Sequence, residues 1–443
     1  HHVFLKSYYL LFIVFVLSIY SIRVGLNFLN KDLDPKYKWM DLIFLSAFLY
    51  LYLWLIHEID FHWMLVFEPY YKYIIGIFFL LVIIYEYSRL VIKFYNKNIN
   101  PALIFVFIFL LLSMSGTLML MLPNATYDGI ALIDALFMSV SAVCITGLTV
   151  VDIGSVFTPF GHKILLGLMQ IGGLGVMTFA GLIGRIFSSG ISFQQQMMLN
   201  EYVVGDKLNE VSRTIMKIVF ITLLVESIGA VFIFFTTLDL EFATYSDRLF
   251  FAVFHSVSAF CNTGFVTFKN GMHNELLRFN YSFQLIVAGL FLFGGIGFPI
   301  VFAFYKNIKL SFLNLFRRIF LGLRPTHLAR QYDLNAKLNI YTTIGLIFVA
   351  FVFIWIFEGN SSLSEHGIWG KFVGVFFAAT TPRSAGFNAV DMSLISLPTI
   401  MLYLLYMWIG ASPGGTGGGI KTTTFSLAVL NFMTISAGKE KII

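Results

Sequence analysis

The chain has 443 residues, of which 58% are hydrophobic and 12% are charged, and its net charge is +6. Soluble domains carry about 25% charged residues, so this composition excludes an ordinary soluble protein. The basic residues are confined to connections between apolar runs, which excludes a nucleic-acid-binding face and indicates membrane orientation instead. The two cysteines cannot form a disulfide framework, and both are interpreted as small packing residues.

Nine apolar stretches are predicted to span a bilayer, because about 20 apolar residues are enough to cross its hydrocarbon core. They lie near residues 4–29, 40–56, 69–94, 101–122, 160–184, 212–236, 282–305, 338–357 and 395–430. The second stretch is short, and the last is interrupted by glycines. The first three belong to no visible repeat, so residues 1–98 are expected to be extra N-terminal transmembrane helices whose role stays open.

From residue 101 onward the same order of segments recurs three times. A long span is followed by a short amphipathic segment, a phrase centred on glycine, and another long span. The short segments cover 129–143, 246–260 and 367–380. Each is too short to cross a bilayer and is predicted to be a half-helix that enters the membrane and turns back. The expected pore repeats are 99–205, 206–330 and 331–443.

The three glycine phrases are Cys144–Leu148, Cys261–Phe265 and Arg383–Phe387, and their glycines are 117 and then 122 residues apart. Close helix packing would explain a single copy. Three copies in one context favour glycine turns that aim carbonyl oxygens at a common axis, where they can replace the hydration shell of K⁺. The negative ends of the half-helices favour a cation there as well. The predicted K⁺ filter consists of Ile145, Thr146, Gly147, Asn262, Thr263, Gly264, Ser384, Ala385 and Gly386.

The second span of each repeat also contains glycines. Gly172–Gly175 and Gly294–Gly297 are predicted to pack closely or to kink their helices. The third copy, Gly410–Gly419, holds six glycines and a proline. Because an interior Gly costs about 1 kcal/mol and Pro about 3, it is predicted to be a non-helical loop in the membrane, below the filter. It departs from the phosphate-binding pattern, since Ile420 separates Gly419 from the lysine and no strand precedes it.

Several polar residues near the phrases carry alternative interpretations. Arg383 is expected to point away from the axis and to pair with the end of its half-helix or with an acid. Asp152 and Asp391 follow their glycines by five residues and either attract cations at an outer mouth or cap local turns. Lys421 marks the cytoplasmic side or places a positive charge near the pore. His255 is expected to be a packing residue.

The sequence predicts no enzyme, because the apolar spans contain no cluster of His, Asp or Glu, and no metal site beyond K⁺ is expected. The connection 306–337 is strongly basic, whereas acidic residues lie beside the half-helices. By the positive-inside rule, the half-helices enter from outside in all three repeats. A common orientation disfavours the inverted repeats of many coupled secondary transporters, although Na⁺ or H⁺ coupling stays open as an alternative.

Four motifs resemble the Trk/Ktr/HKT superfamily of potassium transporters, in particular the bacterial membrane subunits of the Trk and Ktr type. They are SAVCITGLTVVDIG (141–154), HSVSAFCNTGF (255–265), TTPRSAGFNAVD (380–391) and IGASPGGTGGGIKTTTF (409–425). The resemblance implies an all-α polytopic membrane protein with tandem membrane–pore-loop–membrane repeats around one pore. It places filter glycines at Gly147, Gly264 and Gly386. It also implies a gate made of Gly410, Ser412, Pro413, Gly414, Gly415, Thr416, Gly417, Gly418, Gly419 and Lys421.

The resemblance further implies K⁺ uptake across a bacterial inner membrane, with Na⁺ as a second ion that the family leaves open. It implies contact with lipid, a homodimer, and a cytoplasmic ring of nucleotide-binding regulatory subunits. One departure concerns the repeat number, because four repeats are typical and the spacing projects a fourth glycine near residue 505, beyond this chain. We expect a truncated chain; the alternative is a pore completed by another chain.

Overall fold

The computed structural model describes residues 101–175, 211–298, 300–302 and 334–438, with short pieces at 21–22, 24–25, 41–43, 45–46, 49, 314 and 318–319. The chain divides into two compact units, residues 1–90 and 91–443. The described residues of the first unit are helical, and the predicted spans near 4–29, 40–56 and 69–94 lie mostly outside the described residues. The basic connection 306–337 likewise lies mostly outside them.

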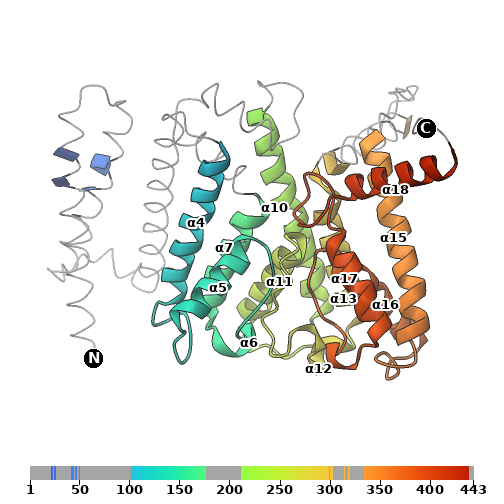
Figure 1. Cartoon of the computed structure of the whole chain (residues 1–443). Helices are drawn as coiled ribbons and strands as arrows, with labels where there is room; N and C mark the ends of the chain where they lie inside the picture. Colours follow the sequence, from blue (N-terminus) through green and yellow to red (C-terminus); the bar gives the residue numbers. More distant parts are fainter. Residues whose placement is uncertain are drawn as a thin grey trace. The chain divides into compact units, whose positions relative to one another are not determined.

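In the described part of the second unit, helices joined by turns and loops form three successive groups (Figure 1). In the first group, the short helix α5 packs against both α4 and α7. Pro159 lies in the first turn of α7, and the hydroxyl of Thr158 caps this helix by accepting a hydrogen bond from the Gly161 N–H at 3.2 Å. The group consists of α4 (Pro101–Leu120), α5 (Leu132–Val143), α6 (Ile153–Val156) and α7 (Pro159–Gly173).

The second group repeats this order with a longer first helix. The short helix α11 is capped by Thr244, whose hydroxyl accepts from the Asp247 N–H at 3.2 Å, and the acid favours the positive end of the helix. Asn280 caps α13 in the same way, at 3.0 Å from the Phe283 nitrogen. The group consists of α10 (Val211–Thr236), α11 (Tyr245–Phe260), η3 (Gly271–His273), α12 (Glu275–Arg278) and α13 (Tyr281–Ile296).

The third group differs in its final helix, which is divided in two by a loop. Helix α17 ends at Trp408, the segment 409–421 is non-helical, and α18 begins at Thr422. This confirms the predicted interruption, which follows from the glycines and Pro413 in the segment. The group consists of α15 (Leu334–Glu358), α16 (Ile368–Thr380), η4 (Thr381–Arg383), η5 (Met392–Leu394), α17 (Leu397–Trp408) and α18 (Thr422–Ser436).

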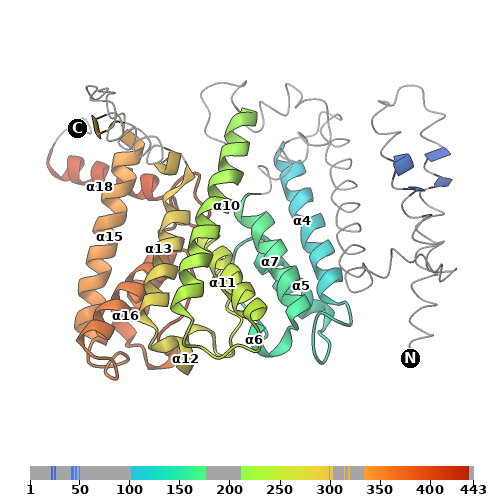
Figure 2. The same cartoon turned by 180° about the vertical axis from the view of Figure 1, so that it is seen from behind.

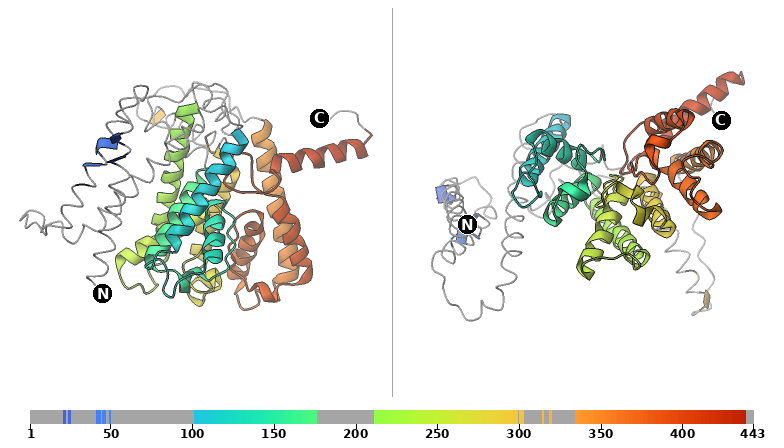
Figure 3. Two further views of the ribbon diagram at one scale, coloured as in Figure 1. Left: turned by 60° about the vertical axis from the view of Figure 1, so that its left-hand side comes forward. Right: turned by 90° about the horizontal axis from the view of Figure 1, so that it is seen from below.

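The three groups lie side by side, as the view from behind and the view from below show (Figures 2 and 3). Contacts between α7 and α11 join the first group to the second, and contacts between α13 and α16 join the second to the third. The connections that lead into the short helices α5, α11 and α16 all lie at the same end of the unit (Figure 1). Buried residues of α11, α13 and the third phrase share one hydrophobic cluster, so the middle group forms much of the core.

Two helices are long and apolar enough to cross a membrane by length and composition, Met216–Thr236 of α10 and Asn335–Glu358 of α15. Large apolar side chains on both are exposed, among them Phe220, Phe232, Ile344 and Phe348. A surface of this kind is suited to contact with lipid acyl chains rather than with water.

The predicted spans 160–184 and 282–305 are not continuous helices as far as the structure describes them. Helix α7 ends at Gly173 and α13 ends at Ile296. Gly297 has a φ of +94°, which a right-handed helix cannot contain, and helical residues resume at Phe298. Gly297 therefore breaks the second of these helices, in agreement with the predicted kink, whereas α7 ends at its glycines and the residues after 175 lie outside the described part.

Candidate functional site

The three predicted filter glycines are brought together by the fold and share one backbone conformation. Their φ angles are +77° at Gly147, +80° at Gly264 and +73° at Gly386. A Cβ at Gly147 would overlap the carbonyl oxygen of Thr263, and a Cβ at Gly264 would lie 2.5 Å from that of Ala385. Each turn thus touches the next one backbone to backbone. Only glycine satisfies both the positive φ and this close approach.

A side-chain hydroxyl at the end of each short helix holds the turn that follows. Ser141 donates to the Leu148 carbonyl at 2.7 Å, and Ser258 donates to the Phe265 carbonyl at 2.8 Å. Thr381 donates to the Phe387 carbonyl at 2.7 Å. In each case the acceptor is the residue directly after the filter glycine. These hydroxyl groups were not predicted, although each precedes its glycine by five or six residues in the sequence.

The carbonyl oxygens of the phrase residues themselves stay free. Within the described part of the chain, the carbonyls of 144–147, 261–264 and 383–386 accept no hydrogen bond from protein, whereas those of the next residues do. The short helices α5, α11 and α16 all end at these turns, so their negative ends point to the same place. Free carbonyls and helix C-termini are groups that can coordinate a cation.

The first two turns resemble each other more than they resemble the third. Ile145 and Asn262, each two residues before the glycine, have φ angles of 56° and 60°. Ser384, at the matching place in the third turn, has a φ of 178° and is extended. The third turn is one residue shorter between its hydroxyl and its glycine, and a left-handed residue is not needed there.

The glycine-rich loop 409–421 is closed at its base by its own backbone. Gly410 N–H donates to the Ile420 carbonyl at 3.0 Å, and Ile420 N–H donates to the Trp408 carbonyl at 3.1 Å. The loop then lies on the end of α13. Ser412 and Thr416 donate their N–H groups to the carbonyls of Gly295 and Gly294, at 3.0 and 3.1 Å. These carbonyls lie in the last turn of α13, so the loop satisfies acceptors that the broken helix leaves open.

The loop also contacts the turn of the second glycine phrase directly. The side-chain amide of Asn262 donates to the Thr416 hydroxyl at 2.7 Å. The same hydroxyl lies 3.1 Å from the Phe260 carbonyl, to which it donates. Thr416 therefore bridges the last residue of α11 and the first predicted filter residue after it. The sequence predicted both a filter and a gate but not this contact between them.

The third turn approaches the loop through Arg383 and Ser384. The Arg383 guanidinium donates to the Gly410 carbonyl at 3.3 Å and lies 3.5 Å from the Thr343 hydroxyl. The predicted partners, the end of the half-helix or an acid, were wrong. The partner is instead a backbone carbonyl of the loop, two residues after the end of α17. A Cβ at Gly417 would overlap the Ser384 hydroxyl, so the loop backbone also packs against this turn.

The remaining predicted gate residues anchor the loop. Asn339 of α15 donates to the Ser412 hydroxyl and accepts from the Thr422 hydroxyl. Lys421 donates to the Gly417 carbonyl at 3.0 Å, which stabilises the loop from within.

A small pocket lies between the second and third groups. Its lining consists of Asn262, Phe291, Leu292, Gly295, Ile296, Thr343, Thr380, Arg383, Ser384 and Ala411.

A buried carboxylate that the sequence analysis did not single out lies behind the second turn. Glu226, in the middle of α10, is 5% exposed. Its two carboxylate oxygens accept from the Gln170 amide of α7 at 3.2 and 3.0 Å, and Cys261 lies 3.8 Å away. The signal that could have found it is a single acid within an otherwise apolar span, since such acids are costly unless they serve a purpose.

The other polar residues take local roles. His255 is fully buried, and its ring nitrogen lies 2.8 Å from the Phe251 carbonyl, in agreement with a packing role. Asp391 accepts from the N–H and hydroxyl of Ser393, at 2.9 and 2.6 Å, and these bonds lower the pKa of its carboxyl. Asp391 therefore caps a local turn, which is one of its two predicted roles. The Asp152 carboxylate accepts from the Ser155 hydroxyl at 2.8 Å.

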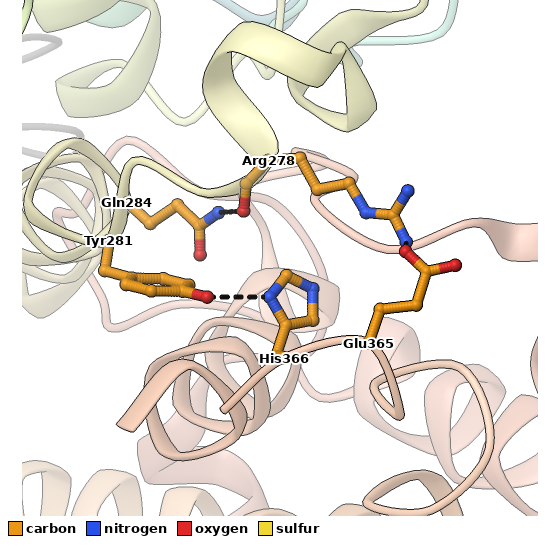
Figure 4. A network of polar contacts seen from close by, with 5 residues as sticks. All are labelled: Arg278, Tyr281, Gln284, Glu365 and His366. Carbon is orange, nitrogen blue, oxygen red and sulfur yellow. Dashed lines mark hydrogen bonds and ion pairs between the residues drawn. The ribbon is translucent and has the colours of Figure 1, made fainter. Parts of the chain in front are cut away.

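At the end where the short helices begin, a polar network joins the second and third groups (Figure 4). Arg278 pairs with Glu365, and the Tyr281 hydroxyl lies 3.0 Å from the His366 ring. Gln284 donates to the Arg278 carbonyl at 2.9 Å, which fixes the end of α12. Within the described residues, no group of His, Cys, Asp and Glu could hold a metal ion.

Comparisons with known proteins agree with this fold. Two potassium uptake proteins B of the Ktr system, from Vibrio alginolyticus and Bacillus subtilis, are each 33% identical to this chain. Each match covers 74% of this chain and 68% of the relative. The potassium/sodium uptake protein NtpJ of Enterococcus hirae is 28% identical over 78% of this chain and 72% of its own length.

The crystal structure of the potassium transporter TrkH from Vibrio parahaemolyticus shares the fold, with a TM-score of 0.57 and 20% identity. The match covers 78% of this chain, which spans 65% of that structure. Residues 75–441 match the family that is described as TrkH, cation transport protein. Because this match extends over most of the chain, the protein belongs to the TrkH family of cation transport proteins.

Proposed function

We propose that the protein takes up K⁺ through a filter of backbone carbonyls at the three glycine turns. The convergence of Gly147, Gly264 and Gly386 carries this proposal, because three turns whose glycines share a positive φ touch one after another. The free carbonyls of 144–147, 261–264 and 383–386 would replace the water around K⁺. The curated names of the Ktr relatives, which describe potassium uptake, support K⁺ as the ion.

The glycine-rich loop is the gate in this proposal. It is held to α13 and to the second turn by hydrogen bonds from Ser412 and Thr416, and it carries few side chains of its own. A segment held in this way can move with the loss of a small number of contacts. Lys421 stabilises the closed arrangement through the Gly417 carbonyl.

The proposed setting follows from the family resemblance and the composition. The exposed apolar faces of α10 and α15 suit lipid, and the bacterial relatives support a bacterial inner membrane. A homodimer on a cytoplasmic ring of nucleotide-binding subunits is the arrangement that the family resemblance implies. The three pore repeats, with boundaries 99–205, 206–330 and 331–443, belong to the same proposal.

A coupled transporter is the second candidate, because one relative is named a potassium/sodium uptake protein. In that case Na⁺ or H⁺ would move together with K⁺. Purified protein in liposomes separates the two, since a channel passes K⁺ without a Na⁺ or H⁺ gradient and a coupled transporter requires one.

Substitution of serine at Gly147 or Gly264 tests the filter. Each added Cβ would meet a neighbouring turn at a positive φ, so we expect the selectivity for K⁺ over Na⁺ to fall. Gly289→Ser is the matched control, because a Cβ at Gly289 meets nothing within 4 Å. Selectivity is measured by flux in liposomes, with gel filtration in detergent as the check of folding. Unchanged selectivity in folded Gly147→Ser and Gly264→Ser proteins would contradict the filter.

A further inference from the structure

We infer that Thr416 of the glycine-rich loop is a specificity-determining residue, which positions the second filter turn and so couples ion selectivity to the loop. This inference rests on the proposed function. It goes beyond it because the gate residue then acts on which ion passes, and not only on whether ions pass.

The Thr416 hydroxyl lies where α11 ends and the second turn begins. It donates to the Phe260 carbonyl at 3.1 Å and accepts from the Asn262 amide at 2.7 Å. Phe260 is the last residue of α11, and Asn262 lies in the run of carbonyls 261–264 that ends at Gly264. One hydroxyl of the loop therefore holds both sides of the point where the helix becomes the filter.

This hydroxyl holds Asn262 in a left-handed backbone conformation. Asn262 has a φ of 60°, which costs energy for a residue with a side chain. Ile145 takes the same conformation in the first turn without a side-chain hydrogen bond, since its side chain is apolar. Asn262 is 2% exposed, so its amide needs partners within the protein. Its strong partner is Thr416; its other contact, the Phe260 carbonyl at 3.4 Å, is longer.

The backbone of Thr416 is itself attached to the end of α13. The Thr416 N–H binds the Gly294 carbonyl at 3.1 Å, and a Cβ at Gly294 would overlap the Phe260 carbonyl. The loop at Thr416 and the end of α13 at Gly294 therefore pack directly against Phe260. If the loop leaves this place, the Asn262 amide and the Phe260 carbonyl lose the same partner together.

The test compares Thr416→Val, which removes the hydroxyl, with Thr416→Ser, which keeps it. We expect Thr416→Val to lower the K⁺ over Na⁺ selectivity about fivefold, the size of one lost hydrogen bond, and Thr416→Ser to retain it. Thr424→Val is the matched control, because Thr424 is exposed on α18. Asn262→Gly keeps the positive φ, and its effect should not add to that of Thr416→Val.

A second readout does not depend on flux. By linkage, K⁺ bound in the filter should hold the loop in place and slow the reaction of a loop cysteine with a thiol reagent. Gly418→Cys is suitable because a Cβ there meets nothing within 4 Å, and the chain without this substitution gives the background from the exposed Cys144. K⁺ should slow labelling relative to Na⁺, and Thr416→Val should abolish the difference.

The outcomes separate this inference from the filter itself. If Gly264→Ser changes selectivity and folded Thr416→Val raises flux without changing selectivity, the filter stands and Thr416 is a gate contact only. An equal loss of selectivity in Thr424→Val would also overturn the inference. If Thr416→Val does not fold, equal labelling of Gly418→Cys in K⁺ and Na⁺ overturns it. If Gly264→Ser leaves selectivity unchanged, the proposed filter fails first.

Discussion

The contact between the first and second groups of helices and the contact between the second and third groups are built from different parts of the chain. At the first contact, side chains interlock: Gln170 binds Glu226, and a Cβ at Gly173 would overlap the Cys261 side chain. At the second, the backbone of a loop binds a helix end, through the N–H groups of Ser412 and Thr416. The first contact packs side chains around the Glu226 carboxylate, whereas the second combines the packing of α13 against α16 with a loop that is attached by a few hydrogen bonds.

This difference indicates that the two contacts have different roles. Close packing around a buried carboxylate resists movement, because both the volume and the hydrogen bonds must be replaced. A glycine-rich segment has little side-chain volume to displace, and its backbone groups can find new partners in water. We therefore expect the first contact to set stability and the second contact to set flux.

Deletion of Ser412–Gly417 should have the largest effect on flux. It removes the hydrogen bonds of the loop to α13 and to the second filter turn, so the closed arrangement loses its support. We expect K⁺ flux in liposomes to rise by about tenfold or more. Each 1.4 kcal/mol by which the closed state is destabilised increases the ratio of open to closed protein about tenfold. Gly289→Ala, which lies outside the loop and has open space at its Cβ, is the control. Unchanged or reduced flux in the folded deletion variant would contradict the proposed gate.

Local signals in the sequence were enough for much of this site. The bounds of α5, α11 and α16 follow from short amphipathic segments, and the turns follow from a phrase that occurs three times. The non-helical loop follows from glycine and proline content alone. Each of these features depends on residues close together in the chain.

Features that depend on distant partners were missed. The bond between Asn262 and Thr416 joins residues 154 positions apart, and no periodicity indicates it. The predicted partner of Arg383 was wrong because the Gly410 carbonyl is free to accept only where the loop replaces the helix. Glu226 could have been noticed as a lone acid, but its partner Gln170 lies in another group of helices.

Glu226→Leu should break the first contact, with a smaller effect on flux than the loop deletion. It leaves the Gln170 amide buried without its acceptor, at a cost of about 1–3 kcal/mol in the free energy of unfolding. Glu226→Gln keeps an acceptor oxygen in place and should be less harmful. The midpoint of thermal unfolding in detergent measures both variants. If Glu226→Leu raises flux while its unfolding midpoint stays unchanged, the proposed division between the two contacts is reversed.

The smallest expected effect is a dependence on pH at the outer end of the second contact. Burial lowers the pKa of His366 below its ordinary value of about 6.5, and the neighbouring Arg278 and His273 lower it further, against the opposing charge of Glu365. A histidine with a lowered pKa stabilises the fold above its unfolded pKa, and this contribution is lost as the pH falls through the folded pKa.

Neutral His366 can accept from the Tyr281 hydroxyl, whereas the protonated ring cannot accept at that nitrogen and is repelled by Arg278. Between pH 7.5 and pH 5, the midpoint of thermal unfolding should therefore fall further for the natural chain than for His366→Gln, which keeps an acceptor at all pH values. Equal falls in the two proteins would show that His366 does not contribute, and the outer contact would then depend on Arg278 and Glu365 alone.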